Sequence, residues 1–584
     1  MAAPIGAARN GDLRRMRNMS GRTTECDVLV IGSGAGGLST AITVRKHGLD
    51  VIVAEKDKFF GGTMAYSGGV LWIPGNAHAV KAGLSDSREA ARTYLRQETG
   101  NYYAEDAVEA FLAAGPRMID FFERETEVRF LLSNYPDYHP DAPGGVPKGR
   151  SLTAMPYDAR CLGRELQRLR PPLETITFIG MMFNSSNEDL KHFFRATRSL
   201  TSALYVARRL ASHIKDLALY RRGVQVTSGN ALAARLARTA FDLDIPILTE
   251  MPAQELIIEG GRVVGARFSS DGETKEIRAH RAVVLACGGF PHDAARLAVA
   301  YPHVARGGRH VSPTPSGNTG DGIRLAETAG GRCEIRHPNA AAWMPVSEVP
   351  LAQGRVGVFP HLVDRYKPGV IAVNRAGRRF TNESESYHDV GAAMIADNAQ
   401  GGPTEAWLIC DHVAMRKYGL GFAKPAPVPA GRYVRSGYLK RGGSLSELAT
   451  AAGIDAAGLE ATVERFNRDA EHGEDPAFGR GRSAFNRFLG DPDHKPNPTV
   501  APIRKAPFYA LKLVMGDLGT FDGLATDVVG RVLSAGGEPV EGLYAVGNDR
   551  ASMMGGSYPG AGITLGPIMT FGYLAGCHLA GREP

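Results

Sequence analysis

The sequence has few of the features that mark membrane-spanning, secreted or metal-holding proteins. No apolar run among its 584 residues approaches the length of a membrane span. The first 24 residues carry five arginines but no apolar core segment, so they indicate a disordered lead-in rather than a secretory signal. No Cys-x-x-Cys pair and no His-Cys cluster at ligand spacing occurs. We therefore predict a cytoplasmic protein without a structural metal or an iron–sulfur centre. The six scattered cysteines are Cys26, Cys161, Cys287, Cys333, Cys410 and Cys577.

An excess of acidic residues is also lacking, since the net charge is +7. The surplus is local: between Arg150 and Arg238, fifteen Lys and Arg face six Asp and Glu. Apolar residues recur there at helical spacing from Leu190 to Ile214. The simplest interpretation of this basic insertion, at about 165–225, is a helix packed against the protein with a solvated basic face. A lid, or a patch that rests on an anionic membrane, is the alternative. Nucleic acid is not expected, because no recognition module accompanies the charge.

A glycine-rich turn, Gly32-Ser33-Gly34-Ala35-Gly36-Gly37, follows the apolar run 28–31 and precedes a helical stretch over 38–47. Such a turn brings the backbone N–H groups of a helix N-terminus close to a pyrophosphate. A second apolar strand, 51–54, ends in Glu55 at the spacing of an acidic residue that binds a ribose. The context predicts a dinucleotide site.

Other glycine-rich segments indicate FAD rather than NAD as the dinucleotide. Lys56 precedes a second loop, Phe60 to Gly69, whose backbone suits a diphosphate and a flavin ring. A strand near residue 544 ends in a Gly-Asn turn suited to a ribityl chain. These parts resemble the FAD domain of the fumarate reductase and succinate dehydrogenase flavoproteins, which implies non-covalent FAD and an acidic residue beside the flavin. The further candidate cofactor contacts are Gly62, Thr63, Ser67, Gly68, Gly69, Gly288, Asp321, Gly547, Asn548, Thr564 and Leu565.

The length calls for two domains, because a single core rarely grows so large. We expect an α/β fold in which a discontinuous Rossmann-like FAD-binding domain, 25–345 and 516–584, receives an inserted α+β catalytic domain over 346–515. A helical region is expected over 87–123. Within the inserted domain the pattern predicts a strand at Gly369–Val373 and a helix at Asp455–Ala470.

Several tyrosines lie within short motifs that suit the dehydrogenation of a carbon–carbon bond. Dehydrogenating such a bond beside a ketone requires a group that polarises the carbonyl, a base for one C–H and a hydride acceptor. The segment Tyr558-Pro559-Gly560-Ala561-Gly562 resembles the C-terminal signature of the 3-ketosteroid 1-dehydrogenases. The resemblance implies that the Tyr558 hydroxyl and the Gly562 N–H hold the steroid ketone, as an oxyanion hole would.

The same resemblance continues at Asn382-Glu383-Ser384-Glu385-Ser386-Tyr387 and implies that Tyr387 is the base. It also implies that Tyr138 is its partner tyrosine and that Tyr135 is a wall residue. A tyrosine loses its proton near pH 10, so the base needs assistance. Phe359 is a further candidate for the apolar wall of the substrate pocket.

The implied reaction removes a proton from carbon 2 and a hydride from carbon 1 of a 3-oxosteroid, and leaves a 1,2 double bond. The chain offers no second redox centre, so an external acceptor, a quinone or a soluble carrier, is implied. Three alternatives stay open: oxidation of the 4,5 bond of a 5α-steroid, reduction of an unsaturated dicarboxylate as in fumarate reductases, and a flavin-binding protein without turnover. The dicarboxylate would require arginine and histidine clamps.

Overall fold

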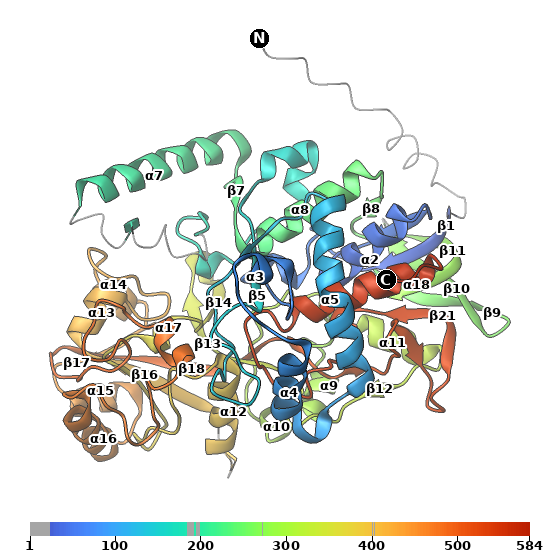
Figure 1. Cartoon of the computed structure of the whole chain (residues 1–584). Coiled ribbons are helices and arrows are strands. Elements are labelled where there is room, and N and C mark those ends of the chain that lie inside the picture. Colours follow the sequence, from blue (N-terminus) through green and yellow to red (C-terminus); the bar gives the residue numbers. More distant parts are fainter. Residues whose placement is uncertain (1–23, 184–191, 194–198, 271, 400, 402) are drawn as a thin grey trace.

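The computed structural model describes residues 24–183, 192–193, 199–270, 272–399, 401 and 403–584 (Figure 1). Nearly all of the expected lead-in and part of the basic insertion, including Leu190, lie outside the described residues.

The first of two large sheets carries the nucleotide fingerprints. Its strand order is β20-β21-β11-β1-β2-β8, and β10 and β9 extend it from β11. Strands β21, β11, β1, β2 and β8 run parallel, whereas β20, β10 and β9 pair antiparallel with their neighbours. The bounds are β1 Thr24–Ile31, β2 Val51–Ala54, β8 Ile247–Leu248, β9 Ala253–Glu259, β10 Arg262–Ser270, β11 Glu273–Leu285, β20 Arg531–Leu533 and β21 Pro539–Ala545.

The parallel strands are continuous apolar runs because both faces of this sheet are covered. Val28 and Val30 of β1 belong to a core with residues of three helices, whereas Leu29 and Ile31 belong to a second core on the opposite face. Glycine at position 572 allows two of these helices to approach closely, since a Cβ there would lie 2.1 Å from Ser39 Oγ. The three helices are α2 (Ala35–Lys46), α8 (Ser228–Asp242) and α18 (Leu565–Leu579).

The second sheet is antiparallel throughout, with the order β14-β13-β18-β16-β15 and with β17 paired to β18. It lies beside the first sheet at the lower left of Figure 1. Its bounds are β13 Ala341–Pro350, β14 Val356–Pro360, β15 Val370–Val373, β16 Glu405–Cys410, β17 Lys440–Gly442 and β18 Phe508–Thr520.

Two elements expected in this region are confirmed. The predicted strand at Gly369–Val373 is β15, and the predicted helix is α16 (Ala456–Ala470), whose N-cap Asp455 accepts a hydrogen bond from Gly458 N–H. Strands β13 and β18 run a few residues beyond 346–515, as far as Ala341 and Thr520. The division of the chain into domains therefore remains a prediction.

Three further helices lie outside the two sheets. The expected helical region over 87–123 is two helices, α4 (Arg88–Thr99) and α5 (Glu105–Glu125), which are separated near Gly100.

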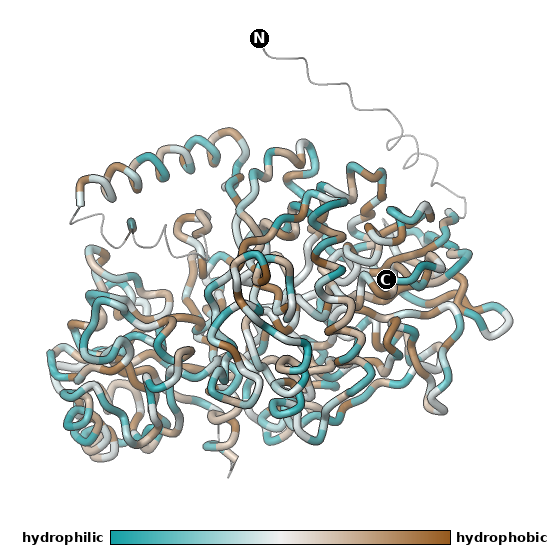
Figure 2. Tube along the Cα trace, in the orientation of Figure 1, coloured by the Kyte–Doolittle hydropathy of each residue, from teal (hydrophilic) through white to brown (hydrophobic). Residues whose placement is uncertain are grey.

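The helix of the basic insertion, α7 (Leu200–Tyr220), lies at the edge of the molecule (Figure 1). Figure 2 shows apolar residues along this helix, which stands apart from the body of the protein. Its apolar stripe, which includes Leu204 and Ile214, is exposed, so the interpretation that the stripe packs against the protein is wrong. None of the described helices combines the length and the apolar character that crossing a bilayer requires.

Candidate active site

A cavity of about 790 Å³ lies where the two sheets meet. On one side it is lined by residues that follow the carboxyl ends of β1, β2 and β11, the edge at which α/β sheets bind ligands. On the other side Pro360, at the end of β14, and Leu518 of β18 complete the wall. The cavity thus joins the glycine-rich turns to the tyrosines that the sequence singled out.

The first glycine turn packs as a pyrophosphate cradle requires. Gly32, Gly34, Ala35 and Gly36 line the cavity, whereas Gly37 does not. A Cβ at Gly37 would lie 2.0 Å from the Gly32 carbonyl oxygen, so this glycine permits the helix to pack tightly on the strand. No side chain caps the N-terminus of α2, and its positive end is therefore available to an anion.

Glu55, the acidic residue after β2, is held in place by hydrogen bonds from Ser33. Ser33 does not line the cavity, because its hydroxyl donates to Glu55 Oε2 at 2.6 Å and its N–H donates to the same oxygen at 3.1 Å. Glu55 itself lines the cavity. The carboxylate is thus oriented toward the place where a ribose would bind.

The second glycine loop lies across the first turn. The Cβ of any other residue at position 62 would come within 3.2 Å of Gly34 Cα, and one at Gly69 would come within 2.3 Å of the Ser228 carbonyl carbon. Asn318 donates to Thr63 Oγ1 at 2.9 Å and ties the loop to the segment before α11 (Asp321–Thr328). The other expected cofactor contacts on the cavity wall are Lys56, Ser67, Gly68, Gly288, Gly547, Asn548, Thr564 and Leu565.

Two carboxylates shape this half of the cavity. Asp321 lines it as expected, and its Oδ2 lies 2.6 Å from Lys56 Nζ. Sequence reasoning missed Asp549, which is fully buried and accepts the N–H groups of Cys287 at 2.6 Å and Gly289 at 2.9 Å. Burial raises the pKa of Asp549, although these N–H groups oppose the shift. Its position directly after the Gly-Asn turn was the available signal.

The residues of this half fit FAD. The glycines leave room that a Cβ would fill, and the N-termini of α2 and α18 meet the wall at Ala35 and Leu565 without a side-chain cap. Oriented N–H groups of this kind bind the pyrophosphate and the negatively polarised edge of a bound flavin.

The tyrosine cluster, which we define as Tyr138, Tyr387 and Tyr558, forms the other half of the site. The hydroxyl oxygens of Tyr138 and Tyr387 are 3.5 Å apart, which is long for an O–H···O bond. The rings of Tyr387 and Tyr558 meet edge to face with centroids 5.0 Å apart, and those of Tyr138 and Tyr558 stack at 5.7 Å. Residues 249 and 420 positions apart in the sequence are thereby brought together.

Gly562 meets the backbone requirement of the Tyr-Pro-Gly-x-Gly turn. Its φ is +98°, and a Cβ there would lie 2.6 Å from the backbone of Leu71 and Trp72. Its carbonyl accepts Trp72 N–H at 3.0 Å. Among the described residues, no hydrogen bond uses the Gly562 N–H. Because Gly562 also lines the cavity, this donor is available to a ligand.

A buried scaffold joins the Tyr138 loop to this turn. Tyr138 N–H donates to the Pro559 carbonyl at 2.9 Å, and Asp137 forms a β-bridge with Gly560. The Asp137 carboxylate accepts from Trp72 Nε1 and from Arg150, both at 2.8 Å. Sequence reasoning missed this scaffold, because its partners are far apart in the chain.

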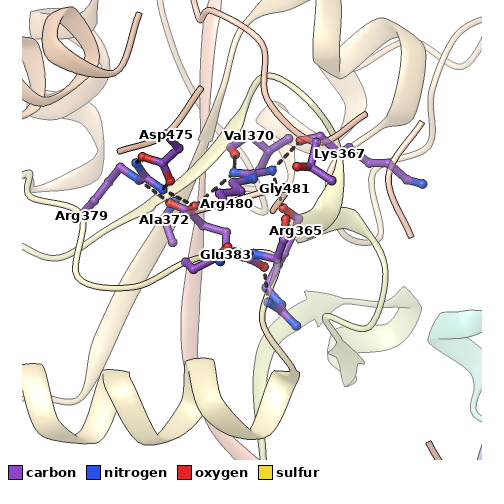
Figure 3. A network of polar contacts seen from close by, with 12 residues as sticks. Arg365, Lys367, Val370, Ala372, Arg379, Glu383, Asp475, Arg480 and Gly481 are labelled. Carbon is purple, nitrogen blue, oxygen red and sulfur yellow. Dashed lines mark hydrogen bonds and ion pairs between the residues drawn. The ribbon is translucent and has the colours of Figure 1, made fainter. Parts of the chain in front are cut away.

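Tyr387 is the first residue of α12 (Tyr387–Asp397), and a buried ion network fixes the segment before it (Figure 3). Glu383 accepts from Arg379 at 2.7 Å and from Arg480 at 3.1 Å, and Arg365 donates to the carbonyls of Glu383 and Glu385. Although burial opposes its charge, the two arginines lower the pKa of Glu383. The network therefore holds the backbone that delivers Tyr387 to the cavity.

A charged histidine links the Tyr138 loop to α12. His139 lies 2.7 Å from a carboxylate oxygen of Glu98 and 3.3 Å from one of Asp389. Burial opposes the charge of His139, but the hydrogen bonds with Asp389 and Glu98 outweigh it and raise the pKa to about 11. His139 is thus a cation at neutral pH and ties the residue after Tyr138 to the second residue beyond Tyr387.

The buried tyrosine cluster favours the neutral form of its hydroxyl groups. Burial raises the pKa of Tyr387 well above 10.0, and Tyr138 and Tyr558 add to the shift. Within the described part of the chain, the lysines and arginines on the cavity wall are Lys56, Lys58 and Arg170. Lys56 pairs with Asp321 and Arg170 with Asp57, both toward the glycine-lined half.

The expectation for Phe359 is wrong. This residue is absent from the cavity wall, and its ring packs near His361 in the second core. Its strand neighbour Pro360 lines the cavity instead, because successive side chains of a strand point to opposite faces. Tyr135 does line the cavity. Sequence reasoning missed further wall residues that carry no motif, including Leu173, Ile176, Met182, Leu362, Tyr366, Phe485 and Leu489.

Known proteins resemble the chain over almost its whole length. The model of the family described as FAD binding domain matches residues 27–565. A 4-oxocyclohex-2-ene-1-carboxylate 5-dehydrogenase of Sinomonas cyclohexanicum is 43% identical over 96% of this chain and 94% of its own length. A 3-oxosteroid 1-dehydrogenase of Mycobacterium tuberculosis is 38% identical over 95% and 98%, respectively.

A solved structure extends the similarity to three dimensions. The crystal structure of a 3-ketosteroid delta1-dehydrogenase from Sterolibacterium denitrificans, in complex with 1,4-androstadiene-3,17-dione, matches with a TM-score of 0.87. It is 36% identical, and the match covers 96% of this chain and 100% of that one.

Proposed function

Because this chain belongs to the FAD-binding domain family and, within it, to the 3-oxosteroid 1-dehydrogenases and their relatives, we propose that it introduces a 1,2 double bond into the first ring of a 3-oxosteroid. The enzyme class is that of an FAD-dependent oxidoreductase. The observation that carries the proposal is the convergence of Tyr138, Tyr387 and Tyr558 beside a glycine-lined FAD cavity.

In the proposed mechanism, Tyr558 and the Gly562 N–H hold the ketone oxygen of the substrate. The Tyr558 hydroxyl and the otherwise unused Gly562 N–H are donors on the wall of a buried site. Two donors aimed at one carbonyl oxygen favour its enolate-like state and acidify the neighbouring C–H. The backbone already holds this turn in place, so little conformational free energy is lost in positioning the two donors when the substrate binds.

Tyr387 then accepts the proton from carbon 2. Its hydroxyl must be ionised to do so, and Tyr138, 3.5 Å away, can donate a hydrogen bond to the resulting oxygen anion. When bound, FAD supplies the hydride acceptor for carbon 1. The apolar walls exclude water and shield the proton transfer.

The wall around the tyrosine cluster supports an apolar substrate. Leu173, Ile176, Met182, Leu362 and Phe485 line the cavity that contains the cluster, and the ring centroids of Phe485 and Tyr138 are 4.3 Å apart. A flat, rigid hydrocarbon skeleton gains free energy from burial against such residues at about 25 cal/mol per Å². A steroid presents this surface, whereas a small acid does not.

A second candidate substrate is 4-oxocyclohex-2-ene-1-carboxylate, which gives its name to the relative from Sinomonas cyclohexanicum. The reaction would again dehydrogenate a bond beside a ring ketone. Its carboxylate, however, calls for a cation near the tyrosine cluster. On the cavity wall, Lys56 and Arg170 instead form ion pairs with Asp321 and Asp57, toward the glycine-lined half.

The same argument disfavours an unsaturated dicarboxylate, which would need two such clamps. Oxidation of the 4,5 bond of a 5α-steroid is the remaining alternative, and it would place the base at a different carbon. We further propose that the first sheet and α18 form a Rossmann-like FAD-binding domain and that the second sheet belongs to the catalytic domain. We also propose that the reduced cofactor passes its electrons to an external acceptor, either a quinone or a soluble carrier.

The test follows the oxidised flavin absorbance of the FAD-loaded protein under anaerobic conditions. Androst-4-ene-3,17-dione should bleach the flavin rapidly and yield a 1,4-diene. Bleaching by 4-oxocyclohex-2-ene-1-carboxylate alone would replace the steroid by the second candidate, and bleaching by a saturated 5α-steroid alone would indicate the 4,5 bond. A flavin that none of these reduces, but that fumarate reoxidises once reduced, would refute the proposal.

A further inference from the structure

Arg550 is a buried cation without the acidic partner that such a charge usually has. The residue is 8% exposed, and its Nε donates to Thr526 Oγ1 at 2.6 Å. The guanidinium carbon lies 3.5 Å from the centroid of the Phe571 ring, in a cation–π contact. Burial lowers the pKa of Arg550 to about 10, so the side chain remains charged at neutral pH. A buried charge is costly unless an anion pairs with it.

The neighbouring carboxylates bind other groups. Asp527 accepts a hydrogen bond from Arg531 Nε at 2.6 Å, although its charge partly opposes the lowering of the Arg550 pKa. Asp549 accepts the two backbone N–H groups that follow β11. In the part of the chain that the structure describes, the Arg550 guanidinium forms no ion pair. Its charge is therefore left for an anion that the protein does not itself supply.

Arg550 lines a small cavity of about 30 Å³ that adjoins the active-site cavity. Gly547, Asn548, Thr564 and Ile568 line both cavities. Thr564 is the N-cap residue of α18, where no side chain caps the helix. The cation and the positive end of α18 thus lie at the same edge of the cofactor site.

The small cavity lies on the side of the tyrosine cluster. Its wall includes Phe521, whose ring centroid is 6.2 Å from that of Tyr558. The first glycine turn and Glu55 lie instead on the wall of the larger cavity, where they suit the pyrophosphate and the ribose. Arg550 lines the small cavity and not the larger one, so it faces the edge of the flavin rather than the substrate.

We propose that the Arg550 guanidinium stabilises the negative charge that FAD acquires on reduction, and so makes the bound cofactor easier to reduce. A hydride carries one proton and two electrons, so the flavin that accepts it from the substrate gains one negative charge. A cation at the edge of the ring lowers the free energy of that charge, because little water screens it in a buried site. This role requires bound FAD and is independent of which substrate is oxidised.

The test measures the midpoint potential of protein-bound FAD against a reference dye during slow anaerobic reduction, without any substrate. Arg550→Gln removes the charge but keeps a donor for Thr526. It should lower the equilibrium constant for reduction about tenfold, which is about 30 mV for two electrons. Arg550→Lys keeps the charge and should change this constant less than about threefold.

Arg235→Gln is the matched control. Arg235 is also a buried cation, 7% exposed, with its guanidinium carbon 4.5 Å from the centroid of the Tyr157 ring. It donates to the carbonyl oxygens of three residues, and it lies on α8 away from the walls of both cavities. Its replacement should disturb the fold in a similar way and leave the potential of FAD unchanged.

The proposal is overturned if Arg550→Gln has the potential of the wild type, or if Arg235→Gln lowers the potential as much. Equal weakening of oxidised and reduced FAD binding in Arg550→Gln also overturns it, and would assign the cation to the pyrophosphate. If Arg550→Gln does not fold, the wild type and Arg550→Lys provide the test: both must hold FAD at a higher potential than that of free FAD. Because no substrate is present, these outcomes are separate from those that test the proposed dehydrogenation.

Discussion

The tyrosine cluster and helix α7 expose their side chains in opposite ways. The cluster buries three hydroxyl groups among apolar side chains, whereas α7 turns Leu204 and Ile214 to the solvent and buries His213. Each arrangement reverses the usual preference, and each costs free energy in the isolated protein. A polar group kept in an apolar cavity indicates chemistry on that group. An apolar stripe kept outside indicates a surface that something else covers.

The contrast between the tyrosine cluster and α7 would lose its meaning if the buried hydroxyl groups took no part in the reaction. We expect Tyr387→Phe to slow cofactor reduction by androst-4-ene-3,17-dione about 10³-fold, because the proton on carbon 2 then has no acceptor. Anaerobic stopped-flow absorbance measures this rate. Tyr135→Phe, a change in the cavity wall, is the control and should alter the rate less than tenfold. Equal rates in the two variants would remove Tyr387 from the mechanism.

The support beneath the cluster should be costly to disturb. Glu383→Gln leaves Arg379 and Arg480 buried with less negative charge and should lower the free energy of unfolding by about 3–5 kcal/mol. Urea denaturation measures this change. Glu541→Gln is the control: its pair with Arg262 is exposed, so a loss of at most about 1 kcal/mol is expected.

The same variant has a pH dependence with a defined sign. The folded-state pKa of Glu383 is lowered, so its ionisation stabilises the folded protein above the ordinary value of 4.5, and this stabilisation is lost as the pH falls. The difference in unfolding free energy between wild type and Glu383→Gln should therefore shrink below that pH. A difference that grows on acidification would contradict the lowered pKa.

The pH profile of the reaction tests the burial of the cluster itself. Tyr387 must be ionised to act, and its pKa lies well above 10.0 because it is buried. The rate of cofactor reduction should therefore rise with pH, by about tenfold per unit between about pH 7 and pH 9. A rate that levels off near neutrality would mean that another group is the base, or that substrate binding lowers the pKa of Tyr387 strongly.

The smallest effect on stability is expected for a substitution on helix α7. Leu204→Asn should change the free energy of unfolding by less than about 0.5 kcal/mol, because the Leu204 side chain is already mostly exposed in the folded protein. Leu236→Ala, in the fully buried part of α8, should cost about 2–5 kcal/mol. A large loss in Leu204→Asn would show that the apolar stripe of α7 is covered within the protein.

Local motifs predicted much of the cofactor half of the site. Between Gly32 and Gly36, the spacing of the glycines reflects how closely backbone may approach a phosphate, and that restriction is visible in any sequence. The role of Asp549 was not predicted, because its partners, the N–H groups of Cys287 and Gly289, are some 260 positions away in the sequence. The element β15 was found because it is a short continuous apolar run, and α16 because its apolar residues recur at helical spacing.

By itself, the sequence determined the FAD chemistry and indicated the candidate tyrosines, because glycine turns and tyrosine motifs consist of a few consecutive residues. Only the tertiary structure decided which side chains face the cavity and which face the solvent. Periodicity defined an apolar stripe on α7, and composition made Phe359 a candidate for the pocket wall, but neither determines which way a side chain faces. That direction depends on contacts between distant segments, such as His213 with Ile179, and these exist only in the folded chain.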